Sequence, residues 1–220
     1  MCPICQTNLP DEVYGICESC HGKLSYLQPP FCQGCGGTVD GILDICSVCV
    51  NNPRPWRKAF SIFNFDGLVR DVVHRFKYNG NVALAPFLVK MIYSQMMAAN
   101  DEQSYQKIVP VPLHWFKEFS RGYNQAELIA IELSRVTRIP YDNLLKRNKW
   151  TKPQARLDRR RRKKNLKNAF TLKKRIKKVP RSAFLLIDDV FTTGSTLEES
   201  AKILLSTGVE AIDVLTIAKG

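Results

Sequence analysis

All eight cysteines of this 220-residue chain lie within its first 49 residues, where they form four CxxC pairs. The first and third pairs are 30 residues apart and the second and fourth are 29 apart, so the segment is an internal duplication. Four sulfur ligands on two tight turns suit a tetrahedral Zn²⁺ ion. The pattern therefore predicts two structural zinc sites of four cysteines each. Their ligands are Cys2, Cys5, Cys17 and Cys20 in the first half, and Cys32, Cys35, Cys46 and Cys49 in the second.

Two other interpretations of the cysteines stay open, a disulfide framework and redox-active CxxC pairs. The chain opens without a basic segment followed by an apolar one, so we expect no signal peptide and a cytoplasmic protein, in which thiols stay reduced. This expectation favours zinc. We expect each half to bind its own ion, with an interleaved, cross-braced pairing as the alternative. Four thiolates leave no open coordination position, so the metal is expected to be structural.

The rest of the chain has the pattern of an α/β domain. A segment rich in Asn and Pro, residues 51–55, marks a boundary, so that residues 1–52 are predicted as a double zinc ribbon and residues 53–220 as the larger domain. Strand and helix patterns then alternate, which predicts a mostly parallel sheet with helices on both faces and ligand sites beyond the carboxyl ends of the strands. Strands are expected at 58–65, 108–111, 183–189 and 211–218, and helices at 67–78, 82–97, 124–136 and 197–206. No segment has the roughly 18 uncharged apolar residues of a membrane span.

Positive charge is concentrated in residues 146–181, which hold 18 Lys and Arg and one acid, Asp158. The formal net charge of the whole chain is +13. A polyanion such as single-stranded DNA is therefore expected to contact this region rather than the cysteine segment, which is acidic. A solvated helix face or a disordered segment is the alternative, since aromatic residues that stack on bases are sparse in the run.

The stretch from Phe184 to Glu199 is the most informative about chemistry. A buried strand ends in Asp188 and Asp189, and a turn of hydroxyl residues around Gly194 then opens a helix. Backbone amides, hydroxyls and the positive end of that helix form an anion cradle of phosphate size. We expect Thr196 to cap the helix, with Glu199 completing a capping box. The two acids can accept hydrogen bonds from a vicinal diol or hold a hydrated Mg²⁺ ion. A phosphate at one end and a diol at the other predict a ribose 5-phosphate.

This stretch resembles the signature of type I phosphoribosyltransferases. The resemblance implies that Asp188 and Asp189, the candidate catalytic residues, contact the ribose hydroxyls of 5-phosphoribosyl 1-pyrophosphate (PRPP), which binds with Mg²⁺. It implies that the loop holds the 5-phosphate through Thr192, Thr193, Gly194, Ser195 and Thr196. These enzymes place a pyrophosphate-binding loop after a strand, where this chain has Pro112 and Leu113, followed by Arg121. An Arg suits a diphosphate because its planar fork can bond two oxygens.

Two of the basic residues have simpler alternative roles. Arg121 is either a pyrophosphate ligand or a partner in a surface ion pair with Glu118 or Glu127. Lys77 is a candidate anion ligand or merely a lysine at the end of a helix.

Further motifs extend the resemblance over essentially the whole chain. They occur in a fixed order, behind the cysteine pairs and ahead of the Asp188 loop: Lys77 to Gly80, Val109 to His114, Arg121 to Gln125, and the set Gln154, Leu157, Arg162, Asn165 and Phe170. The chain resembles the ComF family of competence proteins. The resemblance implies a cytoplasmic, PRPP-binding protein that handles imported single-stranded DNA in natural transformation, with competence proteins such as a helicase as partners.

Two other functions stay open. The chain is a nucleobase salvage enzyme if it transfers the ribosyl group of PRPP to a base with release of pyrophosphate. Against turnover, 6-oxopurine enzymes carry an acid where this chain has Thr192, and no segment is evident for the hood that holds a base. The third function is a zinc-ribbon adaptor, in which residues 1–52 alone bind a protein partner.

Overall fold

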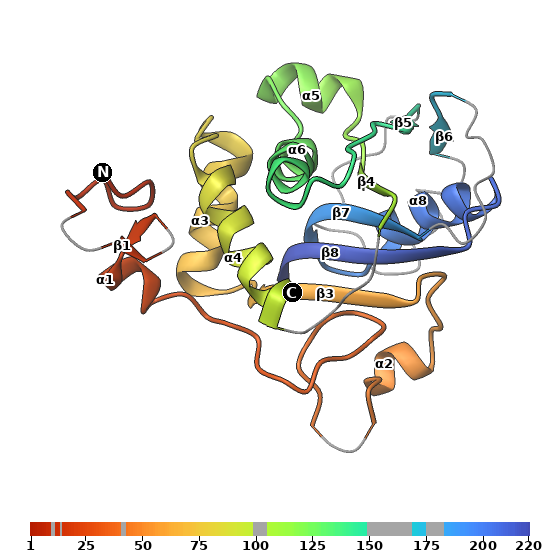
Figure 1. Cartoon of the computed structure of the whole chain (residues 1–220), viewed down its shortest axis with the longest axis horizontal. Coiled ribbons are helices and arrows are strands. Elements are labelled where there is room, and N and C mark those ends of the chain that lie inside the picture. The colour runs from red at the N-terminus through yellow and green to blue at the C-terminus, as the bar shows by residue number, and fades with distance from the viewer. Residues whose placement is uncertain (10–11, 14, 41–42, 99–104, 149–168, 175–182) are drawn as a thin grey trace.

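A four-stranded parallel sheet forms the centre of the computed structural model, which describes residues 1–9, 12–13, 15–40, 43–98, 105–148, 169–174 and 183–220 (Figure 1). The strand order is β3-β8-β7-β4. The bounds are β3 Lys58–Asn64, β4 Lys107–Pro110, β7 Ala183–Phe191 and β8 Ala211–Lys219. All three neighbouring pairs are parallel, so the predicted α/β class is confirmed.

Helices cover both faces of this sheet. α3 (Gly67–Tyr78), α4 (Leu84–Ala98) and α6 (Gln125–Thr137) pack on one face, and α8 (Ser195–Leu205) packs on the other. Successive side chains of a strand point to opposite faces. In β7, Leu185 and Ile187 accordingly join the core with α3, α4 and α6, whereas Phe184 and Leu186 join the core with α8.

Several short elements were not predicted. Around the body these are α5 (Trp115–Arg121) and the antiparallel pair of β5 (Leu145–Arg147) and β6 (Phe170–Leu172). In the cysteine segment they are β1 (Glu12–Val13), β2 (Ile16–Cys17), α1 (Glu18–His21) and α2 (Ser47–Val50). Each has seven residues or fewer, which is too short for hydrophobic periodicity to indicate an element.

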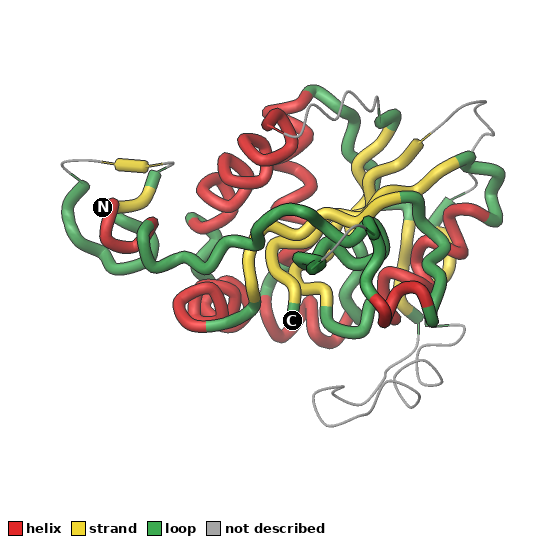
Figure 2. Tube along the Cα trace, turned by 90° about the horizontal axis from the view of Figure 1, so that it is seen from below, coloured by secondary structure: helices red, strands yellow, loops and turns green. Residues whose placement is uncertain are grey.

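The cysteine segment contributes to both cores of the body. Cys2, Ile4, Ile16 and Cys20 are buried in the core that contains α3 and α4, while the second half, from Cys32 to Cys49, joins the core that contains α8. Figures 1 and 2 show the N-terminal end beside α3 and α4 at one end of the molecule, with the chain running from there toward β3. The two halves of the duplication therefore dock at different places on the body. The boundary near residue 52 stays a prediction.

A buried carboxylate fixes the beginning of β8. Asp213 is fully buried and accepts hydrogen bonds from Arg57 Nη2 at 2.6 Å, Tyr105 Oη at 2.9 Å and the Lys58 amide at 3.1 Å. Removing one partner of a buried pair typically costs 3–5 kcal/mol, and we expect about 3 kcal/mol because Arg57 is partly exposed. Asp213→Ala should lower the free energy of unfolding by that amount in urea titrations. The exposed Asp71→Ala should change it by less than about 0.5 kcal/mol; equal effects of the two substitutions would contradict this assignment.

Candidate functional site

A cavity of about 290 Å³ lies where β4 ends and β7 continues beyond it. It contains residues from five separate parts of the chain. The predicted residues that line it are Pro112, Leu113, Arg121, Asp188, Asp189, Thr192 and Thr196. Lys77, at the end of α3, also lines the cavity. This position agrees with its interpretation as a candidate anion ligand. The structure thus brings together the acids, two loop hydroxyls and the segment assigned to pyrophosphate.

Asp188 and Asp189 lie within β7 rather than at its end. The strand was predicted to stop at Asp189, and this was wrong because pairing with β8 continues from Asp188 with Thr216 to Phe191 with Lys219. On the other side β4 pairs only as far as Ile187. The two acids therefore lie just past the end of the neighbouring strand β4. The side of β7 that β4 leaves unpaired there faces the cavity.

The two carboxylates are unequal. Burial raises the pKa of Asp188 to about 7, and the neighbouring charge of Asp189 acts in the same direction. Asp188 Oδ1 accepts a hydrogen bond from the Asp189 amide at 2.8 Å, whereas Asp189 Oδ2 pairs with Lys77 Nζ at 3.0 Å. A ligand that donates hydrogen bonds to Asp188 would favour its charged form, so this site suits a donor such as a diol.

The cavity carries two arginines in addition to Lys77. The Arg121 guanidinium stacks 4.6 Å from the centre of the Tyr78 ring and donates to Gln125 Oε1 at 2.9 Å. Among the described residues it makes no ion pair with Glu118 or Glu127, so the surface-pair alternative is not what the structure shows. Arg147, on β5, was missed by sequence reasoning. A bridge between His114 and Arg147 brings β5 to the cavity, and no local signal could have indicated it.

The loop after β7 makes its turn at Gly194. This residue has φ 73° and is the N-cap of α8, and a Cβ there would lie 2.7 Å from Phe191 Cζ. The helix begins at Ser195, so the predicted cap at Thr196 was wrong, and Glu199 bonds to Lys202 instead of the start of the helix. Thr193, Gly194 and Ser195 do not line the cavity, and Thr193 Oγ1 lies 3.0 Å from Ser195 Oγ. The first amides of α8 have no partner within the helix.

The eight cysteines gather in two groups that follow the two halves of the duplication. Within Cys2, Cys5, Cys17 and Cys20, and within Cys32, Cys35, Cys46 and Cys49, all sulfur atoms lie within 4.8 Å of one another. Measured pairs are 3.5 Å apart for Cys5 and Cys17 and 3.9 Å for Cys35 and Cys46. Tetrahedral sulfur ligands at about 2.3 Å from zinc are about 3.8 Å apart. The thiols are free, and the grouping matches ion binding within each half rather than the interleaved pairing.

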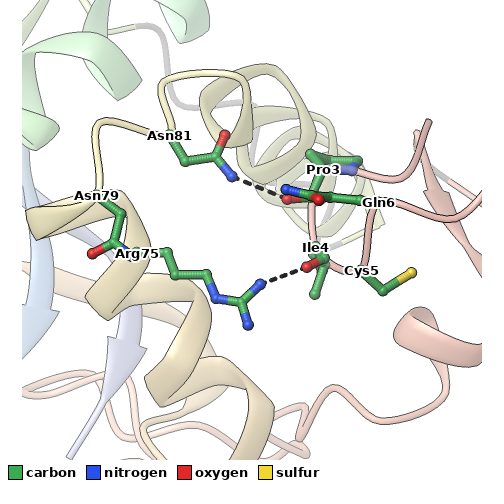
Figure 3. Close-up of a pocket in the computed structure, with 7 residues that line it drawn as sticks. All are labelled: Pro3, Ile4, Cys5, Gln6, Arg75, Asn79 and Asn81. Carbon is green, nitrogen blue, oxygen red and sulfur yellow. Dashed lines mark hydrogen bonds between the residues drawn. The ribbon is translucent and has the colours of Figure 1, made fainter.

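The chemistry of these clusters fits a metal ion. Burial raises the pKa of the Cys20 and Cys35 thiols above the usual range, and a bound cation would offset this by favouring the thiolates. The first cluster docks on α3 and the loop after it, as Figure 3 shows: Arg75 Nη1 donates to Ile4 O at 2.6 Å and Asn81 Nδ2 to Pro3 O at 3.0 Å. An open cavity of about 780 Å³ lies between these segments.

Most of the predicted DNA-binding region, residues 146–181, lies outside the described residues. This holds for Arg159 to Arg162 and for Gln154, Leu157 and Asn165 of the family motif. The described part is residues 146–148 and 169–174, in β5 and β6 and next to them, where Lys146 and Lys173 are exposed. They line a second cavity of about 200 Å³ together with Trp115 of α5, and this cavity shares Pro112, Leu113 and Arg147 with the first.

Helix α5 exposes three aromatic side chains that sequence reasoning did not connect with the basic run. The exposed fractions are 66% for Trp115, 48% for Phe116 and 85% for Phe119. The sequence signal was three aromatics within five residues. The arrangement that brings Trp115 to the same cavity as Lys146 is a tertiary feature. None of the helices in the described parts of the chain is long and apolar enough to cross a membrane.

Comparison with known proteins finds relatives that match along nearly all of the chain. Competence protein F of Haemophilus influenzae is 34% identical over 222 residues, which cover 99% of this chain and 96% of that protein. DNA utilization protein YhgH of Escherichia coli is 29% identical over 100% of this chain and 96% of its own length. Competence protein ComFC of Bacillus subtilis is 27% identical over 92% of this chain and 82% of its own. No model of a known protein family matches the sequence.

Solved structures with a similar arrangement include two phosphoribosyltransferases. A hypoxanthine phosphoribosyltransferase from Staphylococcus aureus has a TM-score of 0.38 at 15% identity and covers 63% of this chain and 64% of its own. An adenine phosphoribosyltransferase from Leishmania donovani has a TM-score of 0.38 at 13% identity, over 64% of this chain and 68% of its own.

Proposed function

The chain belongs to the ComF family of competence proteins, and on that premise we propose that it binds PRPP with Mg²⁺ and acts in the cytoplasm in the handling of imported single-stranded DNA. The relatives named for competence and for DNA utilization support the second half of this proposal. A competence helicase as a protein partner is carried over from the family resemblance.

One observation carries the PRPP proposal. A single cavity contains two carboxylates on β7, hydroxyls of the loop that opens α8, and the cations Lys77, Arg121 and Arg147. A ribose with a phosphate at one end and a diphosphate at the other needs those three kinds of group: loop donors for the phosphate, carboxylates for the diol and cations for the diphosphate. Lys77 pairs with Asp189, and burial raises the pKa of Asp188 to about 7, so Arg121 and Arg147 give the site a net positive charge that suits an anionic ligand.

Each part has a specific role in this proposal. Asp188 and Asp189 accept hydrogen bonds from the two ribose hydroxyls, because ionised carboxylates are acceptors only. The amides at the beginning of α8 and the hydroxyls of Thr192 and Thr196 bind the 5-phosphate. Arg121 and Arg147 bind the diphosphate beyond Pro112 and Leu113. Mg²⁺, when bound with the ligand, neutralises diphosphate charge.

Binding rather than turnover is the proposed activity. Thr192 lines the cavity where a 6-oxopurine enzyme has an acid that contacts the base. An assay of pyrophosphate release from PRPP with a panel of nucleobases should therefore give no signal above that of PRPP alone. Release with any base of the panel would instead support a salvage transferase.

The two cysteine clusters are proposed to hold structural zinc. Each cluster offers four sulfur atoms at separations that suit Zn²⁺. Four ligands fill the tetrahedral coordination of the ion and leave no position for a substrate. We further propose that residues 1–52 and 53–220 are the two units of the chain, with the first folded around the metal.

Single-stranded DNA is proposed to contact the basic residues 146–181 and, among the described residues, the edge formed by α5, β5 and β6. Stacking of a base on an aromatic ring is worth about 1–3 kcal/mol. Trp115 is exposed and lines a cavity with Lys146 and Lys173, and Phe119 is exposed about one turn further along α5. Trp115→Ala with Phe119→Ala should weaken binding of an oligothymidine strand about tenfold or more in fluorescence anisotropy titrations.

The control for this prediction is Phe31→Ala, which removes another partly exposed aromatic ring on the cysteine segment and should not change the affinity. Substituting both Lys146 and Lys173 by glutamine should reduce the salt dependence of binding by about two counterions. An affinity that both sets of substitutions leave unchanged would place the DNA elsewhere.

A further inference from the structure

Arg54 lies between the second cysteine cluster and the loop at the start of α8. Its side chain is 5% exposed. Its guanidinium carbon is 5.5 Å from the centre of the Trp56 ring and 5.6 Å from that of Phe191, and these rings meet edge to face at 6.0 Å. A cation enclosed in this way between two aromatic rings is held in one position.

On one side, Arg54 contacts the second cysteine cluster. A Cβ on Gly34, which lies in the turn between Cys32 and Cys35, would be 3.7 Å from Arg54 Cγ. The backbone of the cluster is close-packed at this point, since a Cβ on Gly34 would lie 2.8 Å from Cys49 Sγ. The Trp56 indole also donates to Gly34 O at 3.0 Å. Arg54 and Trp56 thus both contact the turns that carry the sulfur ligands.

On the other side, Arg54 contacts the anion loop. Its Nη1 lies 3.8 Å from Glu198 Oε2, in the first turn of α8. The same Nη1 lies 3.2 Å from the position that a Cβ on Gly194 would occupy. The Glu198 amide in turn donates to Gly194 O at 2.8 Å, which is the first hydrogen bond of the helix. Arg54 therefore touches the residue at which the loop turns and the residue that closes the helix onto it.

The position of Arg54 depends on these partners. Its buried Nε has no hydrogen-bond partner among the described residues, and an unsatisfied buried donor is unfavourable. A metal ion held by all four sulfur atoms would fix the turns against which Arg54 and Trp56 pack. Occupancy of the second cluster would thus restrain a side chain that contacts Gly194.

We propose that Arg54 is a positioning residue through which the second cysteine cluster, when it holds its metal, fixes the conformation of the loop 192–196. The metal at this cluster and the anion at the loop are then coupled, so that each strengthens binding of the other. The identity of the anion as PRPP rests on the proposed function. The role of Arg54 in ordering the loop is independent of which anion binds.

The first cluster provides a matched contrast. Arg75 docks it on the body through Ile4 O, as Arg54 contacts the second cluster. Gly194 and Glu198 have their contacts with Arg54 and not with Arg75 among the described residues. The variants are therefore Arg54→Gln and Arg75→Gln in the full chain with both clusters loaded with zinc. Arg54→Lys, which keeps the charge facing Glu198, tests for rescue. Glu198→Gln cuts the same link from the helix side and serves if Arg54→Gln does not fold.

The measurement is hydrogen exchange of the backbone amides from Thr193 to Thr196 in the absence of any ligand, followed by PRPP titration with Mg²⁺. Arg54→Gln should speed exchange of these amides about tenfold, within the roughly 5- to 150-fold range of typical coupling between sites. Arg75→Gln should leave it unchanged, and Arg54→Lys should restore at least part of the protection. Cys49→Ser should reproduce the effect of Arg54→Gln, and Cys20→Ser should not.

The two proposals fail in different ways. If Arg54→Gln leaves both exchange and PRPP affinity unchanged, or if Arg75→Gln speeds exchange equally, the positioning role is wrong while PRPP binding stands. If the wild-type chain does not bind PRPP but Arg54→Gln and Cys49→Ser still loosen the loop selectively, the ligand is wrong and the positioning role stands.

Discussion

Replacing Asp188 and Asp189 together by asparagine is expected to lower the affinity for PRPP at least about a hundredfold, since two hydrogen bonds to charged acceptors at about 1.5–3 kcal/mol each are weakened and each 1.4 kcal/mol is tenfold. The two side chains line the cavity, and asparagine keeps their size. Calorimetric titration with PRPP and Mg²⁺ measures the effect.

Asp71→Asn is the matched control for this substitution. It makes the same chemical change on the exposed face of α3, and it should leave the affinity within about twofold of the wild type. The double variant should also remain folded, because it loses one ion pair, Lys77 with Asp189, but relieves the charge repulsion between Asp188 and Asp189. An affinity for PRPP that survives in a folded double variant would contradict the role of the acids.

Substituting Cys35 by serine is expected to remove one of two zinc ions per chain and to lower the free energy of unfolding by more than about 4 kcal/mol, because the free energy of binding structural zinc is folding free energy. Cys32, Cys35 and Cys49 share a core with Trp56 and Phe191. Loss of the ion should therefore loosen the face of the sheet that α8 covers. Zinc content by mass spectrometry of the intact protein and the melting temperature report the two effects.

Serine at Cys5, the most exposed cysteine of the first cluster, is the comparison. It should also remove one ion, but with a smaller fall in melting temperature, since its side chain lies at the surface. Two ions per chain in Cys35→Ser, or a wild-type protein without bound metal, would contradict the assignment of these clusters.

Local sequence was enough to predict the central sheet, because its strands are short apolar runs bounded by turns. The predicted ends differ from the observed ones by at most one residue in β3, β4 and β8. In β7 the prediction stopped at the two aspartates, since acids are uncommon inside a strand, yet pairing with β8 carries the strand through them to Phe191. The helix after the loop was placed two residues late for a similar reason: Gly194 in the left-handed region makes the turn that Thr196 was expected to cap.

The candidate site was predictable where its residues follow one another in sequence. Asp188, Asp189, Thr192 and Thr196 come from one strand and turn, and all four line the cavity. The cysteine groups were predictable because each half carries its own two pairs of ligands.

Arg147 and Arg54 could not be predicted. The first reaches the cavity through the pairing of a three-residue strand, and the second contacts residues some 140 positions away, Gly194 and Glu198. No period or motif indicates such contacts.

A crystal structure of the protein with PRPP and Mg²⁺ tests most directly whether the turn after β7 binds a sugar phosphate. We predict the 5-phosphate against the amides from Thr193 to Thr196, the ribose hydroxyls within hydrogen-bonding distance of Asp188 and Asp189, and the diphosphate facing Arg121 and Arg147. An empty cavity at saturating ligand, or PRPP bound away from this turn, would contradict it.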